Sequence, residues 1–110
     1  MAELPDRCVD GAARLSESEI AEHASLLHPD WTFAGQESLS RRLKVQDFKA
    51  ALRLLNAIGE VAEDQNHHPD LAVSDYRFVT ISLTTHDAGG ITANDLVLAR
   101  QADALANRIG

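Results

Sequence analysis

Residues 47–86 read DFKAALRLLNAIGEVAEDQNHHPDLAVSDYRFVTISLTTH, and the hydrophobic period changes within this segment. Up to Ala62, apolar residues recur at helical spacing, and Asp47 is a suitable N-cap. Pro69 ends this part, because the residue before a proline avoids the helical region. From Leu71 onward, apolar and polar residues alternate, which indicates two strands. The segment therefore predicts a long helix followed by a strand pair.

The long helix should pack against more than one neighbour, since its apolar stripe is broad. The stripe consists of Phe48, Ala51, Leu52, Leu55, Ile58 and Ala62, and it is widened by Leu54 and Val61. Gly59 lies inside the helix, where glycine costs roughly 1 kcal/mol relative to alanine. A close approach of a neighbouring backbone would explain this glycine.

Upstream of this segment, the sequence predicts a shorter helix and another strand pair. Ser16 and Glu19 have the spacing of a capping box, and Pro29 ends the helix that they open. Trp31 and Phe33 share one face of the first strand. The second strand places four residues on one face: Leu39, Arg41, Leu43 and Val45.

Downstream, Thr92 and Asp95 repeat the helix-start pattern and open a last helix. The element order is therefore α-β-β-α-β-β-α. We predict an α+β fold with a four-stranded, mainly antiparallel sheet and three helices on one face of it. We assign residues 1–15 to a loosely ordered N-terminal arm and residues 16–110 to a single domain.

Composition and charge exclude several classes of protein. The chain has 110 residues, of which 45% are hydrophobic and 25% charged, as in an ordinary globular domain. Its net charge of −7 disfavours binding to nucleic acid or to an anionic membrane surface. Cys8 has no partner for an internal disulfide, and neither a spanning apolar run nor a secretory signal is visible. We therefore expect a cytoplasmic protein.

The residues with the greatest chemical potential gather at predicted element ends. His67 and His68 lie between the long helix and the third strand, His86 ends the fourth strand, and Asp95 opens the last helix. Histidine titrates near neutral pH, so paired histidines can act as general acid and general base. Loops at element ends are where such sites are usually built.

Simpler roles for these residues remain open. Adjacent histidines at a helix end can bind the last carbonyl groups, His86 can be an ordinary strand-end residue, and Asp95 suits a capping box. Three histidines and a carboxylate also form a plausible zinc set. However, neighbouring residues on a helix point about 100° apart, and no His-Glu-x-x-His spacing exists. We therefore expect no metal.

The spacing of Glu63, His67-His68-Pro69, Tyr76, His86 and Asp95 resembles the signature of the pterin-4a-carbinolamine dehydratases. The segment from Leu83 to Gly90 is also typical of that family, and the resemblance extends from Ser16 to the C-terminus. It implies dehydration of 4a-hydroxytetrahydropterin to quinonoid dihydropterin, which recycles the pterin for an aromatic amino acid hydroxylase. It also implies no metal or organic cofactor and a homodimer or homotetramer.

By the same resemblance, His67, His68 and His86 correspond to the active-site histidines. Asp95 would orient a histidine or bound the pocket, and Glu63 would support the site. Tyr76 and Pro69 match positions that we interpret as structural and near the site. Our hypothesis is that His67 and His86 form the acid–base pair.

The sequence departs from the family pattern on the second strand pair. Arg77 stands where asparagine is common, and Leu71 stands where some relatives carry an aromatic residue. Some family members bind a homeodomain transcription factor as a dimerisation cofactor, so the alternative function is a non-catalytic dimerisation or assembly factor. The complete histidine set favours the enzyme.

Overall fold

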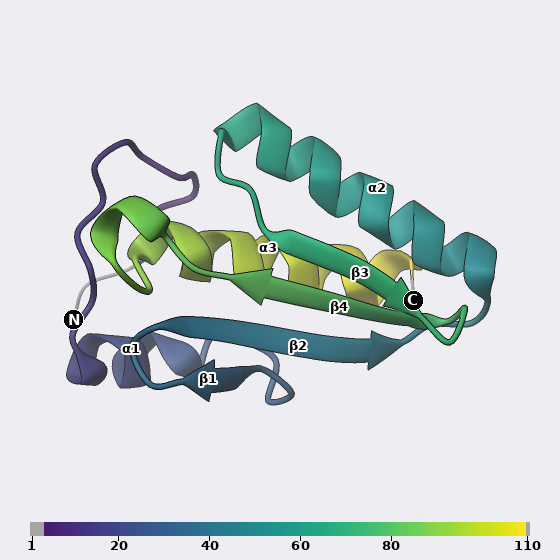
Figure 1. Cartoon of the computed structure of the whole chain (residues 1–110), viewed down its shortest axis with the longest axis horizontal. Helices are drawn as coiled ribbons and strands as arrows, with labels where there is room; N and C mark the ends of the chain where they lie inside the picture. The colour runs from purple at the N-terminus through teal and green to yellow at the C-terminus, as the bar shows by residue number, and fades with distance from the viewer. Residues whose placement is uncertain (1–3, 110) are drawn as a thin grey trace.

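The computed structural model describes residues 4–109, which form the predicted α+β fold (Figure 1). The elements are α1 (Glu17–Ala24), β1 (Thr32–Ala34), β2 (Ser38–Lys44), α2 (Phe48–Gln65), β3 (Asp70–Ser74), β4 (Phe78–Leu83), a 3-10 turn η1 (His86–Ala88) and α3 (Ala93–Ile109). The sheet order is β1-β2-β4-β3, and every neighbouring pair is antiparallel. Within residues 4–109, no helix is both long enough and apolar enough to cross a membrane.

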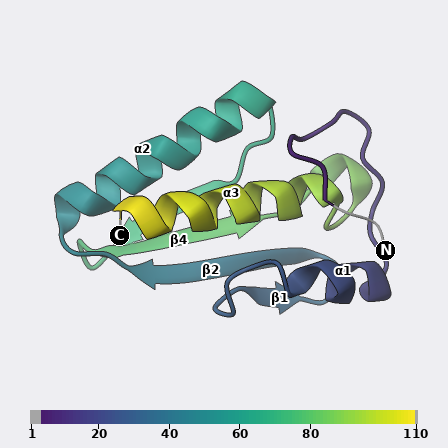
Figure 2. The ribbon, with the colours of Figure 1, turned by 180° about the vertical axis from the view of Figure 1, so that it is seen from behind.

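The sheet register places the apolar side chains on one face. Leu39 pairs with Leu83, Leu43 pairs with Val79, and all four are buried. The helices lie over this face, as the two opposite views show (Figures 1 and 2). The outward residues of β2 alternate with the buried ones, and Arg42 and Lys44 are exposed. The predicted strand faces are therefore confirmed.

The predicted helix starts are also confirmed by their hydrogen bonds. The Ser16 hydroxyl accepts from the Glu19 N–H, and the Glu19 carboxylate accepts from the Ser16 N–H. The Asp47 carboxylate accepts from the Ala50 N–H at 2.8 Å and begins α2. Each of these bonds satisfies a backbone donor that the first helical turn leaves free.

The stripe predicted for α2 was partly wrong. Phe48 and Leu52 are exposed by 50% and 38%, whereas the buried residues of the helix are Ala50, Ala51, Leu54, Ile58 and Ala62. Three of these five buried residues are alanines. A side chain built on Gly59 would meet nothing within 4 Å, so the expected close approach is also wrong.

The N-terminal segment packs along the end of the molecule that holds η1 and the C-terminal end of α2 (Figures 1 and 2). Leu4 is buried, and Arg14 forms an isolated bridge with Thr92. Residues 1–3 of the expected arm lie outside the described residues. The division between arm and domain remains a prediction.

Candidate active site

His67 and Asp95 meet at the end of the sheet where β3 begins and β4 ends. The His67 Nε2 lies 2.6 Å from Asp95 Oδ1, and the exposed fractions of the two side chains are 12% and 0%. Asn66 caps the C-terminal end of α2 and has a left-handed backbone, and the His67 N–H donates to the carbonyl of Ala62. This helix termination turns His67 toward the first turn of α3.

The Asp95 carboxylate is held by two further donors. Its Oδ2 accepts from the Thr92 N–H at 2.9 Å and from the Thr85 hydroxyl at 2.8 Å. The Thr92 hydroxyl in turn lies 2.9 Å from the Thr85 hydroxyl. Asp95 therefore completes the predicted helix start and also orients a histidine, with a hydrogen-bond partner for each oxygen.

The pairing with Asp95 defines the tautomer of His67. A carboxylate only accepts hydrogen bonds, so the Nε2 of His67 carries the proton that this bond uses. In the neutral imidazole, the lone pair then lies on Nδ1. The arrangement leaves Nδ1 as the atom of His67 that can take up a proton.

His68 forms a separate and more exposed pair. Its Nε2 lies 2.8 Å from Glu63 Oε2, and the exposed fractions of the two side chains are 57% and 80%. Solvent screens such a pair, which contributes at most about 1 kcal/mol. His68 and Glu63 therefore lie beside the site without a buried partner.

The loop after β4 places His86 on the 3-10 turn η1. Thr85 and Gly90 close this loop with two backbone hydrogen bonds. Gly89 has φ +75°, and a Cβ on Gly90 would lie 2.5 Å from the carbonyl oxygen of Gln36, so both positions require glycine. The His86 side chain is exposed, and none of the side-chain hydrogen bonds found in residues 4–109 involves it.

A cavity of about 350 Å³ opens beside His67. It is lined by the end of α2, by Thr85 and Asp87 of the loop after β4, by Asn94 of α3 and by residues 9–12. Of the three histidines that the sequence predicted for the site, only His67 lines this cavity. The lining contains two carboxylates, Asp10 and Asp87, and no lysine or arginine.

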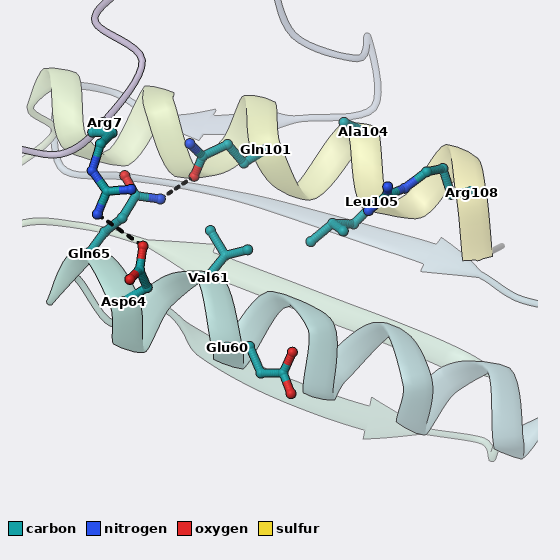
Figure 3. A pocket seen from close by; sticks show the side chains of 9 residues that line it. All are labelled: Arg7, Glu60, Val61, Asp64, Gln65, Gln101, Ala104, Leu105 and Arg108. Atoms are coloured by element: carbon teal, nitrogen blue, oxygen red, sulfur yellow. Dashed lines mark hydrogen bonds and ion pairs between the residues drawn. The ribbon is translucent and has the colours of Figure 1, made fainter.

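A second cavity of about 620 Å³ lies between α2 and α3 (Figure 3). Val61 and Leu105 supply its apolar part, and Arg7 pairs with Asp64 at one end of it. It contains no histidine, and the side chains around it are mostly charged or aliphatic. We therefore place the candidate site at the cavity beside His67.

The structure separates Tyr76 from the other predicted residues. Pro69 directly follows His68 and precedes β3, close to the site. Tyr76 lies in the turn between β3 and β4, at the opposite end of the hairpin, and is 59% exposed. Arg77 lies in the same distant turn, where its Nε donates to the carbonyl of Val45.

Two residues of the site were missed from the sequence. Thr85 bonds to Asp95, and Asn94 lines the cavity while bonding to the N-terminal segment. A threonine at a strand end and an asparagine inside a helix start are common in other roles, so no local signal distinguished them. Across residues 4–109, no group of three histidine, cysteine or acidic side chains is placed to hold a metal ion.

The family model described as Pterin 4 alpha carbinolamine dehydratase matches residues 13–105. The chain belongs to this family. The match begins after the arm residues that line the cavity and includes His67, His68, His86 and Asp95.

Similar carbinolamine dehydratase family members occur in several bacteria. A protein of Nocardia farcinica, provisionally named pterin-4-alpha-carbinolamine dehydratase, is 46% identical over 84% of this chain and 94% of its own length. A Cyanothece protein with the same provisional name is 49% identical over 81% of this chain and 89% of its own.

Two solved structures share the fold. A Brucella melitensis protein described as a transcriptional coactivator/pterin dehydratase has a TM-score of 0.78 and 34% identity, covering 84% of this chain and 98% of that one. A pterin dehydratase-like protein described as a RuBisCO assembly factor in the alpha-carboxysome has a TM-score of 0.60 and 22% identity. That second match covers 72% of this chain and 92% of the other, and it shows the fold alone.

Proposed function

We propose that this protein dehydrates 4a-hydroxytetrahydropterin to quinonoid dihydropterin by histidine acid–base catalysis. The observation that carries the proposal is His67, held at a cavity wall by the buried carboxylate of Asp95. Membership of the dehydratase family supplies the substrate class. The Asp95 contact gives one histidine a defined tautomer, which a proton-transfer group requires.

The reaction removes water across one carbon–nitrogen bond of the pterin ring. A proton leaves the ring nitrogen, its electron pair forms the new double bond, and the hydroxyl leaves with a delivered proton as water. The Nδ1 of His67 is suited to one of these transfers, because Asp95 occupies the other ring nitrogen. The proposal assigns the second transfer to His86, with His68 and Glu63 assisting beside the cavity.

The cellular context belongs to the same proposal. A homodimer or homotetramer of this chain would form the quinonoid dihydropterin in the cytoplasm. A separate reductase would then have to reduce that product before an aromatic amino acid hydroxylase could use the pterin again. The protein needs to supply only a proton donor and a proton acceptor for this reaction, so the proposal includes no metal or organic cofactor. Asp10 and Asp87 at the cavity suit the hydrogen-bond donors of a neutral pterin ring.

The proposal is tested by the absorbance decay of freshly generated 4a-hydroxytetrahydropterin. Wild-type protein should accelerate the decay, and His67→Ala should lower kcat/KM by roughly 10²- to 10⁴-fold, the range of a general acid–base contribution. His28→Ala is the matched control, because that histidine lies before β1 and contacts the distant half of α3. His67→Gln, which can still donate to Asp95, covers the case in which the alanine variant unfolds.

The alternative is a non-catalytic dimerisation or assembly factor of the same fold. The pterin dehydratase-like protein described as a RuBisCO assembly factor shares its fold with this chain. The assembly role is a description of that protein. If folded wild-type protein leaves the spontaneous decay unchanged, the dehydratase proposal fails and this alternative takes its place.

A further inference from the structure

We propose that residues 9–12 form one wall of the substrate site and that Asn94 is the positioning residue that holds them there. This inference rests on the proposed function. Val9, Asp10, Gly11 and Ala12 line the same cavity as His67. They precede residues 13–105, which match the family model, so this wall lies outside the matched region.

Asn94 holds the arm through both atoms of its side-chain amide. Its Oδ1 accepts from the Val9 N–H at 2.9 Å, and its Nδ2 donates to the Val9 carbonyl at 2.7 Å. The residue is only 7% exposed, so both of its polar groups depend on the arm for their partners. Its neighbour Asp95 binds His67, and the first turn of α3 therefore positions two walls of the cavity.

Other contacts hold the arm on either side of residues 9–12. Before them, the Cys8 N–H donates to Gln65 Oε1 at 2.8 Å, and Leu4 is buried in the core. After them, the Leu15 N–H donates to the carbonyl of Ile91 at 2.8 Å. Figure 3 shows one further contact, an exposed pair between Arg7 and Asp64 that lies outside the site cavity. The arm is thus fixed at both ends while its middle faces the cavity.

The charge of this wall indicates which substrates the cavity accepts. Asp10 of the arm and Asp87 of the loop after β4 are the only carboxylates that line the cavity, and no lysine or arginine lines it. An anionic side chain on the pterin would be repelled, whereas the ring's amino and N–H groups can donate to carboxylates. We therefore infer a preference for pterins with an uncharged side chain.

Cys8 provides a reporter of arm attachment that is independent of activity. It is the only cysteine of the chain, it is half-buried, and its Sγ lies 3.5 Å from the carbonyl oxygen of Asn94. Burial, reinforced by the nearby Asp95 carboxylate, raises the pKa of the Cys8 thiol to about 11. While the arm is attached, the Cys8 thiol should react slowly with a chromogenic disulfide reagent near pH 8. The rate of this labelling should rise with pH up to about 11.

The first experiment measures Cys8 labelling in Asn94→Ala. Loss of two hydrogen bonds should shift the opening equilibrium by roughly thirtyfold and accelerate labelling accordingly. The matched control is Asp64→Asn, which removes the exposed pair with Arg7 but leaves the wall intact. In the wild type, 7,8-dihydrobiopterin should slow labelling. Unchanged labelling in Asn94→Ala would overturn the role of Asn94.

The second experiment measures kinetics with a change in the arm itself. Ala12→Leu should raise KM, because Ala12 lines the cavity, whereas Ala13→Leu should not, because Ala13 is exposed and lies outside it. Neither variant alters the helices, so both should fold. Equal KM values for the two would overturn the arm as a wall of the site. If the wild type lacks dehydratase activity, the proposed function fails, and protection of Cys8 by 7,8-dihydrobiopterin then decides the wall alone.

Discussion

At the scale of single residues, Asp95 both caps a helix start and pairs with a histidine. Its Oδ2 accepts from the Thr92 N–H and the Thr85 hydroxyl, and its Oδ1 faces the Nε2 of His67. A capping carboxylate is held rigidly by the helix that it starts, and that rigidity passes to the imidazole. The two explanations that the sequence left open for Asp95 are therefore compatible.

The substitution Asp95→Asn should separate these tasks. The amide oxygen can keep the bonds to Thr92 and Thr85, while the amide nitrogen faces His67 and forces the opposite tautomer. We expect a folded protein whose kcat falls by roughly 10²- to 10⁴-fold. Stopped-flow dehydration and thermal unfolding together check this prediction, and a folded variant with near wild-type kcat would contradict it.

At the scale of elements, α2 carries more exposed apolar surface than its period predicted. Phe48 and Leu52 point away from the core, and Gly59 has open space where its side chain would lie. Helical spacing shows that a helix has an apolar side but not how far it is rotated against the sheet. The small residues Ala50 and Ala51 face the core in place of the larger ones.

The open space at Gly59 leads to a stability prediction. Gly59→Ala should raise the free energy of unfolding by about 1 kcal/mol, because alanine loses less backbone entropy in a helix and meets no neighbour. Urea unfolding followed by circular dichroism measures the change. Ala57→Gly in the same helix is the matched control and should act in the opposite direction. A less stable Gly59→Ala would show that this face contacts something that the single chain does not include.

At the scale of the whole molecule, Asp103 ties three distant segments together. Its Oδ1 accepts from Arg41 of β2 at 2.6 Å and from the Trp31 indole at 2.8 Å, and its Oδ2 accepts from the His28 N–H. The Arg41 and Asp103 side chains are 8% and 15% exposed. The Nε of Arg41 is the one buried side-chain nitrogen or oxygen among residues 4–109 that lacks a partner.

Removing this carboxylate should be costly. Asp103→Ala leaves the Arg41 charge buried without a counter-charge, and we expect a loss of about 3–5 kcal/mol in the free energy of unfolding. Asp75→Asn breaks the exposed pair with Arg42 and serves as the control, with a loss below about 1 kcal/mol. Denaturant unfolding of the wild type and of both variants measures the two losses in the free energy of unfolding. Similar losses in both variants would contradict a special role for the buried pair.

Much of the fold could be predicted from local signals. The capping box at Ser16, the N-cap at Asp47 and the alternation in β2 and β4 each depend on residues a few positions apart. Contacts between residues a few positions apart need only the local helix or strand backbone, so the sequence pattern is enough to predict them. The histidines were singled out because they lie at the ends of elements that these local patterns predict.

The site itself depended on packing between distant segments. His67 and Asp95 are 28 positions apart, and Val9 meets Asn94 across 85 positions. No local rule predicts such meetings, because they follow from how α2 and α3 lie over the sheet and where the arm returns. The sequence alone therefore established the elements, their order and the candidate histidines. The tertiary structure determined which histidine has a buried carboxylate partner and which segment closes the cavity, since both depend on long-range packing.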